Sequence, residues 1–232
     1  MKRIKKILIP LVVFLASIFT GKCNLKVSGT EIKVNLGCGL RCLPNWINID
    51  GSLTALFSSK RFSFLNKLLY HLAGSSEYYS FEEFDTIIKK NKLHFYDLRK
   101  GIPLLTGSID VLYTSHFLEH INKNDAKNFI KECYRVLKPG GLLRVVVPDL
   151  DMAFKMYKEG KAEEMLDSFF YTSDIYDFHM HKYNYNFKTL GILLKNAGFS
   201  DIQKKSYQKG KCPDINFLDI YPEHSLYVEA KK

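Results

Sequence analysis

The chain has 232 residues, of which 46% are hydrophobic and 25% charged, and its formal net charge is +10. This composition excludes a disordered chain and suits one folded domain with a full core. Residues 1–26 hold six Lys and Arg and no acidic residue, which leaves a net charge of only +4 for the rest of the chain. No basic stripe interleaved with aromatic residues follows, so the sequence predicts no nucleic-acid partner.

The five cysteines are irregularly spaced and odd in number: Cys23, Cys38, Cys42, Cys133 and Cys212. Cys38 and Cys42 lack a second Cys or His pair at the spacing of a zinc site. The sequence therefore predicts reduced thiols in a cytoplasmic protein and no metal site.

Residues 1–26 combine a basic run, KRIKK, with an apolar run, ILIPLVVFLASIFT. The apolar run of 14 residues is shorter than the roughly 20 that a transmembrane helix needs. Four interpretations fit this pattern: an export signal, a short anchor, a helix lying in the membrane interface with its lysines on anionic headgroups, or a helix packed on the domain. We therefore separate a membrane-associating segment at 1–26 from a domain at 27–232.

The stretch IKVNLGCGLRCLPNWINID predicts a strand, a glycine turn and a second strand that ends at Asp50. Glycine accepts positive φ and lets a ligand approach the backbone at Gly37 and Gly39. A carboxylate at the end of the neighbouring parallel strand is where nucleotide-binding sheets hold ribose hydroxyls. Only nine residues separate Leu36 from Trp46, too few for a full crossover helix, so a turn must replace it. The short connection also counts against a nicotinamide cofactor, because its binding motif is a GxGxxG turn followed directly by a helix.

Strands and helices alternate over the rest of the chain. Helices are predicted at 64–73, 81–90, 125–137 (capped by Asn124 and stopped by KPGG), 150–171 (split at Gly160) and 187–197, and strands at 93–96, 109–114, 142–147, 202–207 and 225–230. Residues 51–92 would form a substrate lid or a crossover helix with a long tail. The pattern predicts an α/β fold: a Rossmann-like, doubly wound, mostly parallel seven-stranded sheet with an antiparallel C-terminal edge.

The motifs VNLGCG, WINIDGS, YDLRKGIP, YTSHFLEHI, ECYRVLKPGGLLRVVVPDL and SLYVEA together resemble the class I S-adenosylmethionine-dependent methyltransferases. Small bacterial members associated with surface-polysaccharide synthesis are the most similar. The resemblance covers residues 31–232 and does not extend to residues 1–26.

The resemblance implies S-adenosyl-L-methionine as cofactor. Asp50 would bind the ribose hydroxyls, and Asp97 would accept from the adenine amino group, with Leu98 against the ring. Ser115 and His116 would face the methionine part and the transferring methyl. The complete implied set is Leu36, Gly37, Cys38, Gly39, Asp50, Gly51, Asp97, Leu98, Ser115 and His116.

Methyl transfer is an in-line displacement, and a histidine of near-neutral pKa suits an alcohol acceptor as a base. We predict His116 and His181 as catalytic residues. We predict His120, His181, Tyr183 and Tyr185 as substrate-binding residues, because the segment before the last helix is where such folds place the acceptor; packing histidines and a core aromatic cluster are the alternatives.

Charged residues near these motifs have plainer expected roles. We expect Glu119 to pair on the surface. Arg99, Lys100 and Arg144 could meet an anionic substrate, and a solvated charge is the default expectation for each.

The predicted function is methyl transfer from S-adenosylmethionine to a small or lipid-linked acceptor, best matched by a hydroxyl of a surface-glycan sugar. The acceptor class rests on the resemblance alone. A non-catalytic cofactor-binding, membrane-tethered scaffold subunit is the alternative. Because the cofactor is a cytosolic metabolite, we expect a cytoplasmic enzyme, with residues 1–26 on the inner face of the cytoplasmic membrane.

Overall fold

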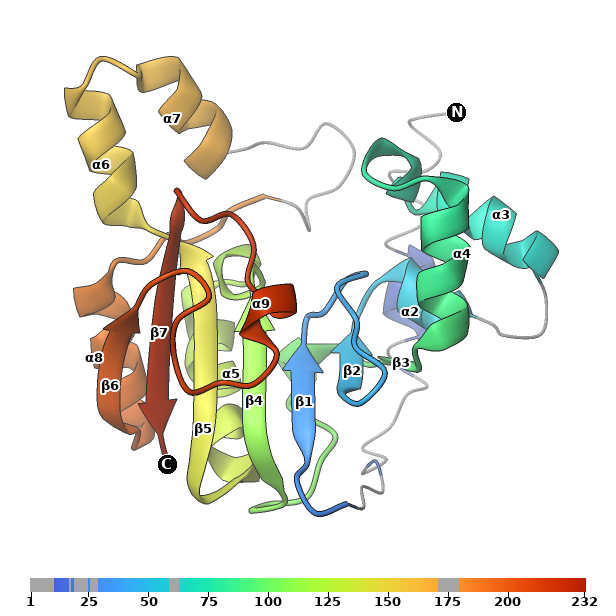
Figure 1. Cartoon of the computed structure of the whole chain (residues 1–232), viewed down its shortest axis with the longest axis horizontal. Helices are drawn as coiled ribbons and strands as arrows, with labels where there is room; N and C mark the ends of the chain where they lie inside the picture. Colours follow the sequence, from blue (N-terminus) through green and yellow to red (C-terminus); the bar gives the residue numbers. More distant parts are fainter. Residues whose placement is uncertain (1–10, 17, 19–24, 26–28, 59–62, 171–179) are drawn as a thin grey trace.

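The computed structural model describes residues 11–16, 18, 25, 29–58, 63–170 and 180–232. A seven-stranded sheet with the order β3-β2-β1-β4-β5-β7-β6 runs through the molecule (Figure 1). Its strands are β1 (Lys33–Leu36), β2 (Ile47–Asp50), β3 (Leu93–Phe95), β4 (Ile109–Ser115), β5 (Leu137–Pro148), β6 (Ser200–Lys205) and β7 (Ser225–Lys231). β1 to β5 pair in parallel, whereas β7 pairs antiparallel with both β5 and β6. The predicted fold class is confirmed.

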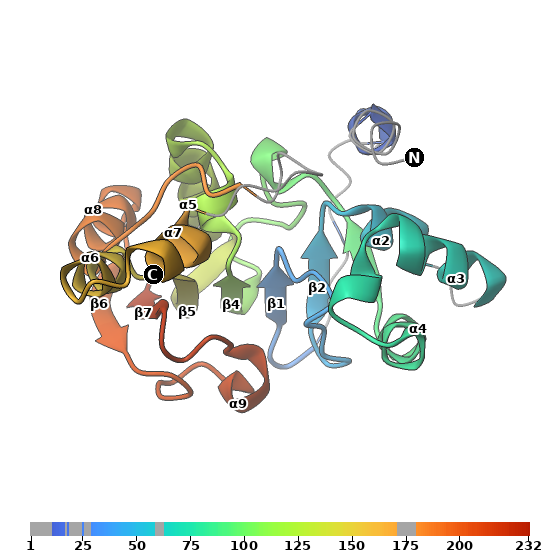
Figure 2. The same cartoon turned by 90° about the horizontal axis from the view of Figure 1, so that it is seen from above.

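The helices form separate groups, one of which is the pair α6 and α7 above the upper end of β5 (Figures 1 and 2). α5 and α8 cover one face of the sheet, the short α9 lies on the other face, and α2, α3 and α4 stand beyond the β3 edge. Their bounds are α2 (Leu53–Phe57), α3 (Ser63–Leu72), α4 (Phe81–Lys90), α5 (Lys123–Val136), α6 (Leu150–Lys158), α7 (Ala162–Phe169), α8 (Phe187–Ala197) and α9 (Ile215–Leu218), with 3-10 turns η1 (Ser75–Glu77), η2 (Leu98–Lys100) and η3 (Leu118–His120).

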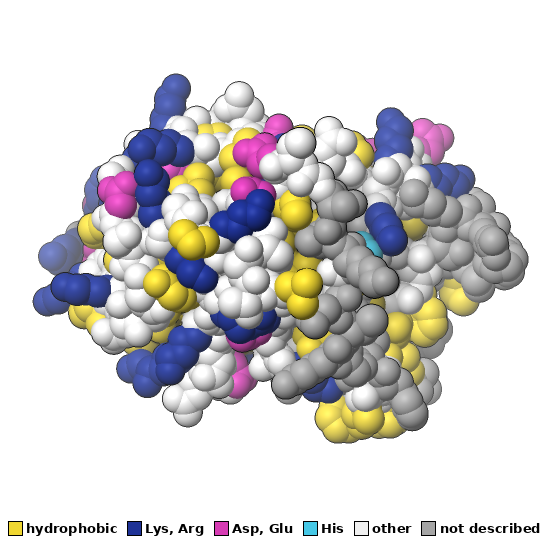
Figure 3. Space-filling view, turned by 90° about the horizontal axis from the view of Figure 1, so that it is seen from below, with side chains coloured by type: hydrophobic (Ala, Val, Ile, Leu, Met, Phe, Trp, Pro, Cys, Tyr) yellow, Lys and Arg dark blue, Asp and Glu magenta, His cyan; other side chains and the backbone are white. Residues whose placement is uncertain are grey.

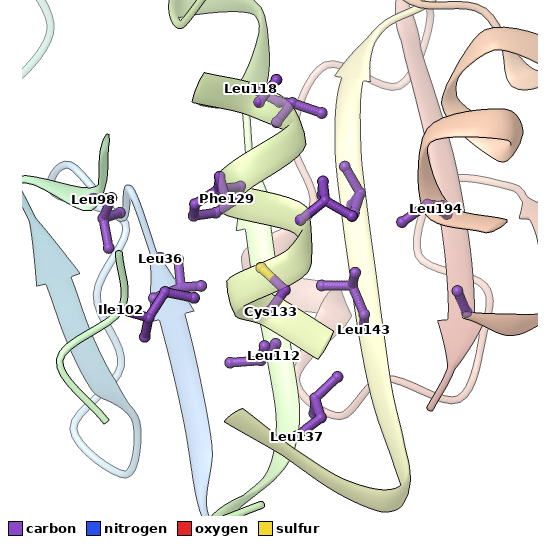
Figure 4. Packing of buried hydrophobic residues seen from close by; sticks show 14 of the residues in the cluster. Leu36, Leu98, Ile102, Leu112, Leu118, Phe129, Cys133, Leu137, Leu143 and Leu194 are labelled. Atoms are coloured by element: carbon purple, nitrogen blue, oxygen red, sulfur yellow. The ribbon is translucent and has the colours of Figure 1, made fainter. Parts of the chain in front are cut away.

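The main core lies between α5 and the sheet (Figure 4). Leu36 of β1 and Leu112 of β4 point toward α5, where Phe129 and Cys133 are at most 1% exposed. Side chains alternate along a strand, so the next residues of the same strands face α9. Tyr113 of β4 accordingly packs with Leu218 of α9 in a second, smaller cluster.

The connection between β1 and β2 contains turns and no helix, as its length predicts. The α9 face of β1 and β4 is therefore without the usual crossover helix. The segment between β6 and β7 covers it instead, through α9 and Tyr207. This substitution shapes the site described below.

Two local predictions need correction. Asn122, not Asn124, caps α5: its Oδ1 accepts from the backbone N–H of Asn124 (3.0 Å) and Asp125 (2.9 Å). KPGG, at residues 138–141, does not separate α5 from β5. It lies within β5, which starts at Leu137, and Gly140 N donates to Lys232 O (2.9 Å). The helix predicted at 187–197 matches α8, capped by Asn186 as expected.

Surface charge is dispersed on the face drawn in Figure 3, which looks at the lower end of the strands of Figure 1. Lys and Arg side chains stand among acidic and uncharged ones there. No helix among the described residues is long and apolar enough to cross a membrane.

Candidate active site

A cavity of about 380 Å³ opens at the carboxyl ends of β1, β2 and β4. We call it the Asp50 cavity. Its wall contains Gly37, Gly39, Asp50, Gly51, Ser52, Leu53, Thr54, Asp97, Leu98, Arg99, His116, Phe117, His120, Ile121 and Lys182, with Val13 and Ala73 at its edge. Carboxyl ends of parallel strands are where open α/β sheets bind ligands.

The glycine turn after β1 needs glycine for two different reasons. Gly37 has φ +66°, and a Cβ there would lie 2.7 Å from the Phe117 ring, so only glycine lets this ring pack on the turn. Gly39 has φ +51°, and a Cβ on it would meet no atom within 4 Å, because it would point into open space. A ligand can therefore approach the backbone closely at Gly39.

Asp50 holds this turn while facing the cavity. Its Oδ2 accepts from Gly39 N (2.8 Å) and its Oδ1 from Ser52 N (2.7 Å). A carboxylate has about four acceptor positions, so each oxygen keeps one for a ligand. Two hydrogen-bond donors on neighbouring atoms, such as the hydroxyls of a ribose, would match this arrangement.

Asp97 is paired with Arg99, whose side chain is 41% exposed and so is solvated as expected, besides being paired. The guanidinium donates from Nε to Oδ1 and from Nη2 to Oδ2, each at 2.8 Å, and Arg99 N donates to Oδ1. Burial raises the pKa of Asp97, but Arg99 outweighs it and holds that pKa below its ordinary value. One acceptor position remains on Oδ2 for a ligand donor.

His116 follows β4 in a left-handed backbone conformation (φ 49°), which is uncommon outside glycine and recurs at functional sites. Its Nδ1–H donates to Glu119 Oε1 (3.1 Å), and Nε2 accepts from the Ser225 hydroxyl (3.0 Å). The ring lines the Asp50 cavity and meets Tyr221 edge-on, with centroids 5.0 Å apart.

Glu119 contradicts the expectation of a surface pair, because its side chain is fully buried. Burial by itself raises the pKa of this carboxyl, but the hydrogen bond from His116 and the electrostatic effect of the His116 and His120 rings outweigh it and hold the pKa below its usual range. The strand end therefore carries a buried, ionised carboxylate directly behind the cavity wall.

A second cavity of about 440 Å³ lies on the other side of the glycine turn. We call it the tyrosine cavity, since Tyr79, Tyr113, Tyr207 and Tyr221 line it; Asn35, Cys38, Leu40, Arg41, Ser115, Leu218, Asp219 and Ile220 complete the wall, together with Gly37 and Gly39. The two cavities share these two glycines.

Arg144 supports the wall of the tyrosine cavity and is neither solvated nor open to a substrate, because it is 0% exposed. Its Nε donates to Asp219 Oδ1 (3.0 Å) and its Nη1 to Glu229 Oε1 (3.1 Å) and to Lys209 O (3.1 Å). Glu229 in turn accepts from Lys211 N (2.9 Å). These contacts fasten the β6–β7 connection to the middle of the sheet.

Comparison with known proteins agrees with this architecture. The family model described as Methyltransferase domain matches residues 82–145. A protein of Mycolicibacterium smegmatis named as a probable S-adenosylmethionine-dependent methyltransferase is 39% identical over 57 residues, which cover 23% of this chain and 21% of that protein. The matched part of this chain is therefore similar to S-adenosylmethionine-dependent methyltransferases, and it spans about a fifth of the length of the Mycolicibacterium smegmatis protein.

Solved structures resemble this chain over most of its length. A possible exported protein from Bordetella parapertussis superposes with a TM-score of 0.51 at 16% identity, covering 89% of this chain and 63% of that one. An S-adenosylmethionine-dependent methyltransferase from Thermotoga maritima gives a TM-score of 0.49 at 16% identity, covering 95% and 88% of the two chains.

The similarity to these methyltransferases implies S-adenosylmethionine as the cofactor. Of the residues predicted to bind it, Gly37, Gly39, Asp50, Gly51, Asp97, Leu98 and His116 line the Asp50 cavity. Cys38 and Ser115 line the tyrosine cavity instead, and Leu36 is buried in the main core.

The part of the Asp50 cavity that α2 and its capping residue form was not predicted from the sequence. Ser52, Leu53 and Thr54 line it, and the Ser52 hydroxyl caps α2 by accepting from Ala55 N (3.3 Å). A serine directly after Asp50-Gly51 and before an apolar run is the signal that could have revealed this helix.

The residues predicted to bind the acceptor separate into two groups. His120 and His181 meet with ring centroids 5.1 Å apart. Tyr185 is 3% exposed in the main core, and Tyr183 packs against that core, which favours the packing interpretation for these two rings. His179, Tyr171 and Tyr176 fall outside the described residues, as does Cys23.

Proposed function

We propose that this methyltransferase transfers the methyl group of S-adenosylmethionine to a hydroxyl of a small or lipid-linked acceptor, with surface-glycan sugars as the preferred class. The observation that carries the proposal is the pair of cavities that meet at Gly37 and Gly39. One presents the carboxylates expected for a nucleoside, and the other presents tyrosine rings and Arg41. Aromatic rings beside polar groups suit a sugar, which has both apolar faces and hydroxyls.

The described residues fit the cofactor. Asp50 would hold the ribose through its two remaining acceptor positions, and Leu98 would lie against the adenine. The open space over Gly39 would let the ligand lie directly against the protein backbone. When bound, S-adenosylmethionine supplies a methyl group activated by the sulfonium sulfur.

Alignment is the main contribution of the protein to an in-line transfer. His116 stands between the two cavities, since it lines the first and contacts Tyr221 of the second. Glu119 and Ser225 fix its ring from both nitrogens. His116 would thus set the boundary at which donor and acceptor meet; its assignment as catalytic, like that of His181, stays a prediction.

Calorimetry and a transfer assay test the proposal. We expect the purified chain to bind S-adenosylhomocysteine and to transfer labelled methyl to a member of a panel of nucleotide-linked and polyprenyl-linked sugars. Tyr221→Ala should raise the acceptor KM about tenfold, because an aromatic contact contributes roughly 0.5–1.5 kcal/mol, and should leave cofactor binding unchanged. Tyr157→Ala, on the exposed side of α6, is the matched control. Cofactor binding without transfer to any sugar would contradict the acceptor class and favour a scaffold subunit.

We also propose that the N-terminal segment rests on the inner face of the cytoplasmic membrane. Residues 11–16 and 18 are helical, and Val12 and Val13 pack toward the cluster formed by α2, α3 and α4. On this helix Leu11, Phe14, Leu15 and Ile18 are 45–58% exposed, at the i, i+3, i+4, i+7 spacing of one face. The basic run at residues 2–6 precedes this apolar face, a combination that suits anionic lipid.

Sedimentation with vesicles tests the membrane proposal. The full chain should sediment with vesicles of phosphatidylcholine and phosphatidylglycerol. Leu15→Ser combined with Ile18→Ser should weaken this binding by at least about tenfold, because each buried apolar side chain contributes roughly 1.5–3 kcal/mol. Leu166→Ser combined with Ile192→Ser, which removes equally exposed side chains elsewhere, should have no effect. Absence of binding to anionic vesicles by the unaltered chain would refute the proposal.

A further inference from the structure

Glu119, His120 and His181 form a cluster beside the Asp50 cavity, which His120 lines. One ligand atom from each of these side chains lies within 4.8 Å of the others. The residues come from η3 and from the segment that precedes α8, about sixty positions later in the chain. Two backbone hydrogen bonds join these segments, from Lys182 N to Glu119 O (2.7 Å) and from Tyr183 N to the same oxygen (3.3 Å).

The Glu119 carboxylate is incompletely satisfied. Its Oε1 accepts from His116 Nδ1, whereas its buried Oε2 has no hydrogen-bond partner within the part of the chain that the structure describes. A buried polar atom without a partner costs free energy, and a charged one costs more. A buried carboxylate oxygen left without a donor points to a cation that the site is built to hold.

The two histidines are oriented as metal ligands usually are. His181 Nδ1 lies 2.8 Å from Phe169 O, and His120 Nδ1 lies 3.3 Å from Met180 O. A carbonyl oxygen only accepts, so each Nδ1 carries the proton and the lone pair of the neutral ring is on Nε2. Histidines that bind metals through one nitrogen typically donate the other N–H to a carbonyl or carboxylate in this way.

We propose that Glu119, His120 and His181 bind a divalent transition metal ion such as Zn²⁺. Two imidazoles and one carboxylate are a common ligand set for zinc sites that keep an open position. Ligands of a tetrahedral ion lie about 3.4 Å apart, so binding requires these side chains, now within 4.8 Å of one another, to close by up to about 1.4 Å.

The site borders the Asp50 cavity, because His120 and Lys182 line that cavity. An open coordination position there could hold an oxygen atom of a bound molecule. Any role of the ion in methyl transfer rests on the proposed function, whereas the metal site itself does not. The sequence predicted no metal because only the cysteines were spaced suggestively; the fold brings these three residues together.

Cobalt and zinc binding tests the site on the full chain, made without a histidine tag and stripped with a chelator. Co²⁺ should bind at one equivalent per chain with the visible absorption of a coordinated ion, and Zn²⁺ should displace it. Glu119→Gln and His181→Gln should each weaken binding by more than the roughly 10–100-fold that loss of an outer partner costs. His71→Gln, on α3, should bind as the unaltered chain does.

Two further measurements keep the outcome decisive. Thermal unfolding should show that Zn²⁺ raises the Tm of the unaltered chain and of His71→Gln but not of the two ligand variants, and far-ultraviolet circular dichroism should report whether each variant is folded. If the chain holds no stoichiometric metal, or if both ligand variants bind as tightly as the unaltered chain, the proposal is overturned. The second result would assign the metal to another group, such as the thiols of Cys38 and Cys42, which lie 3.8 Å apart. Metal binding needs neither cofactor nor acceptor, so failure here is separable from failure of the proposed function.

Discussion

Asp50→Ala should weaken the binding of S-adenosylhomocysteine by roughly a hundredfold or more. A hydrogen bond to a charged group contributes about 1.5–3 kcal/mol, and the arrangement at Asp50 leaves room for two such bonds to a ribose. The variant also removes the acceptor for Gly39 N and Ser52 N, so the glycine turn loses the contact that shapes it. Both effects act in the same direction, and calorimetry measures their sum.

Asp110→Ala is the matched control for this variant. Asp110 Oδ2 also accepts a backbone N–H, that of Ile32 (2.8 Å), but Asp110 lies at the start of β4, away from the cavity. The control therefore loses a similar carboxylate contact without touching the proposed ribose site. If Asp50→Ala bound the ligand within a few-fold of the unaltered chain, Asp50 would not be a cofactor residue.

Most of the fold could be predicted because its determinants are local. α8 has a capping residue, an apolar face and a terminal glycine within one short stretch, and its predicted bounds match the structure. The short connection between β1 and β2 was readable from its length alone. By contrast, α2 has only five residues and rests on β3 and α3, so its sequence carries little periodicity of its own.

The site could be predicted where function is tied to a strand end, and not where it depends on distant contacts. Asp50 ends β2, whereas Asp97 and His116 follow β3 and β4, and all three line one cavity. The burial of Glu119 and its meeting with His181 depend on how the segment before α8 docks on η3. No spacing in the sequence expresses this contact.

Arg144→Met should lower the free energy of unfolding by about 3–5 kcal/mol, because it leaves two buried carboxylates without their cation. Asp219 and Glu229 are 1% and 3% exposed, so water cannot replace the guanidinium. Lys138→Met is the control: it breaks a partly exposed pair with Asp110 and should cost no more than about 1 kcal/mol. Denaturant unfolding of both variants measures the difference, and equal losses would contradict a special role for the Arg144 network.

The same variant should affect ligand binding at the two cavities to different degrees. Asp219 belongs to the wall of the tyrosine cavity, and Arg144 is what ties that wall to β5. The Asp50 cavity takes no lining residue from the β6–β7 connection. Under conditions where Arg144→Met remains folded, acceptor binding should therefore weaken more than S-adenosylhomocysteine binding. An equal loss of both would mean that the β6–β7 connection also supports the glycine turn. Arg41, whose Nε donates to Phe217 O (2.8 Å), would then be the contact to examine next.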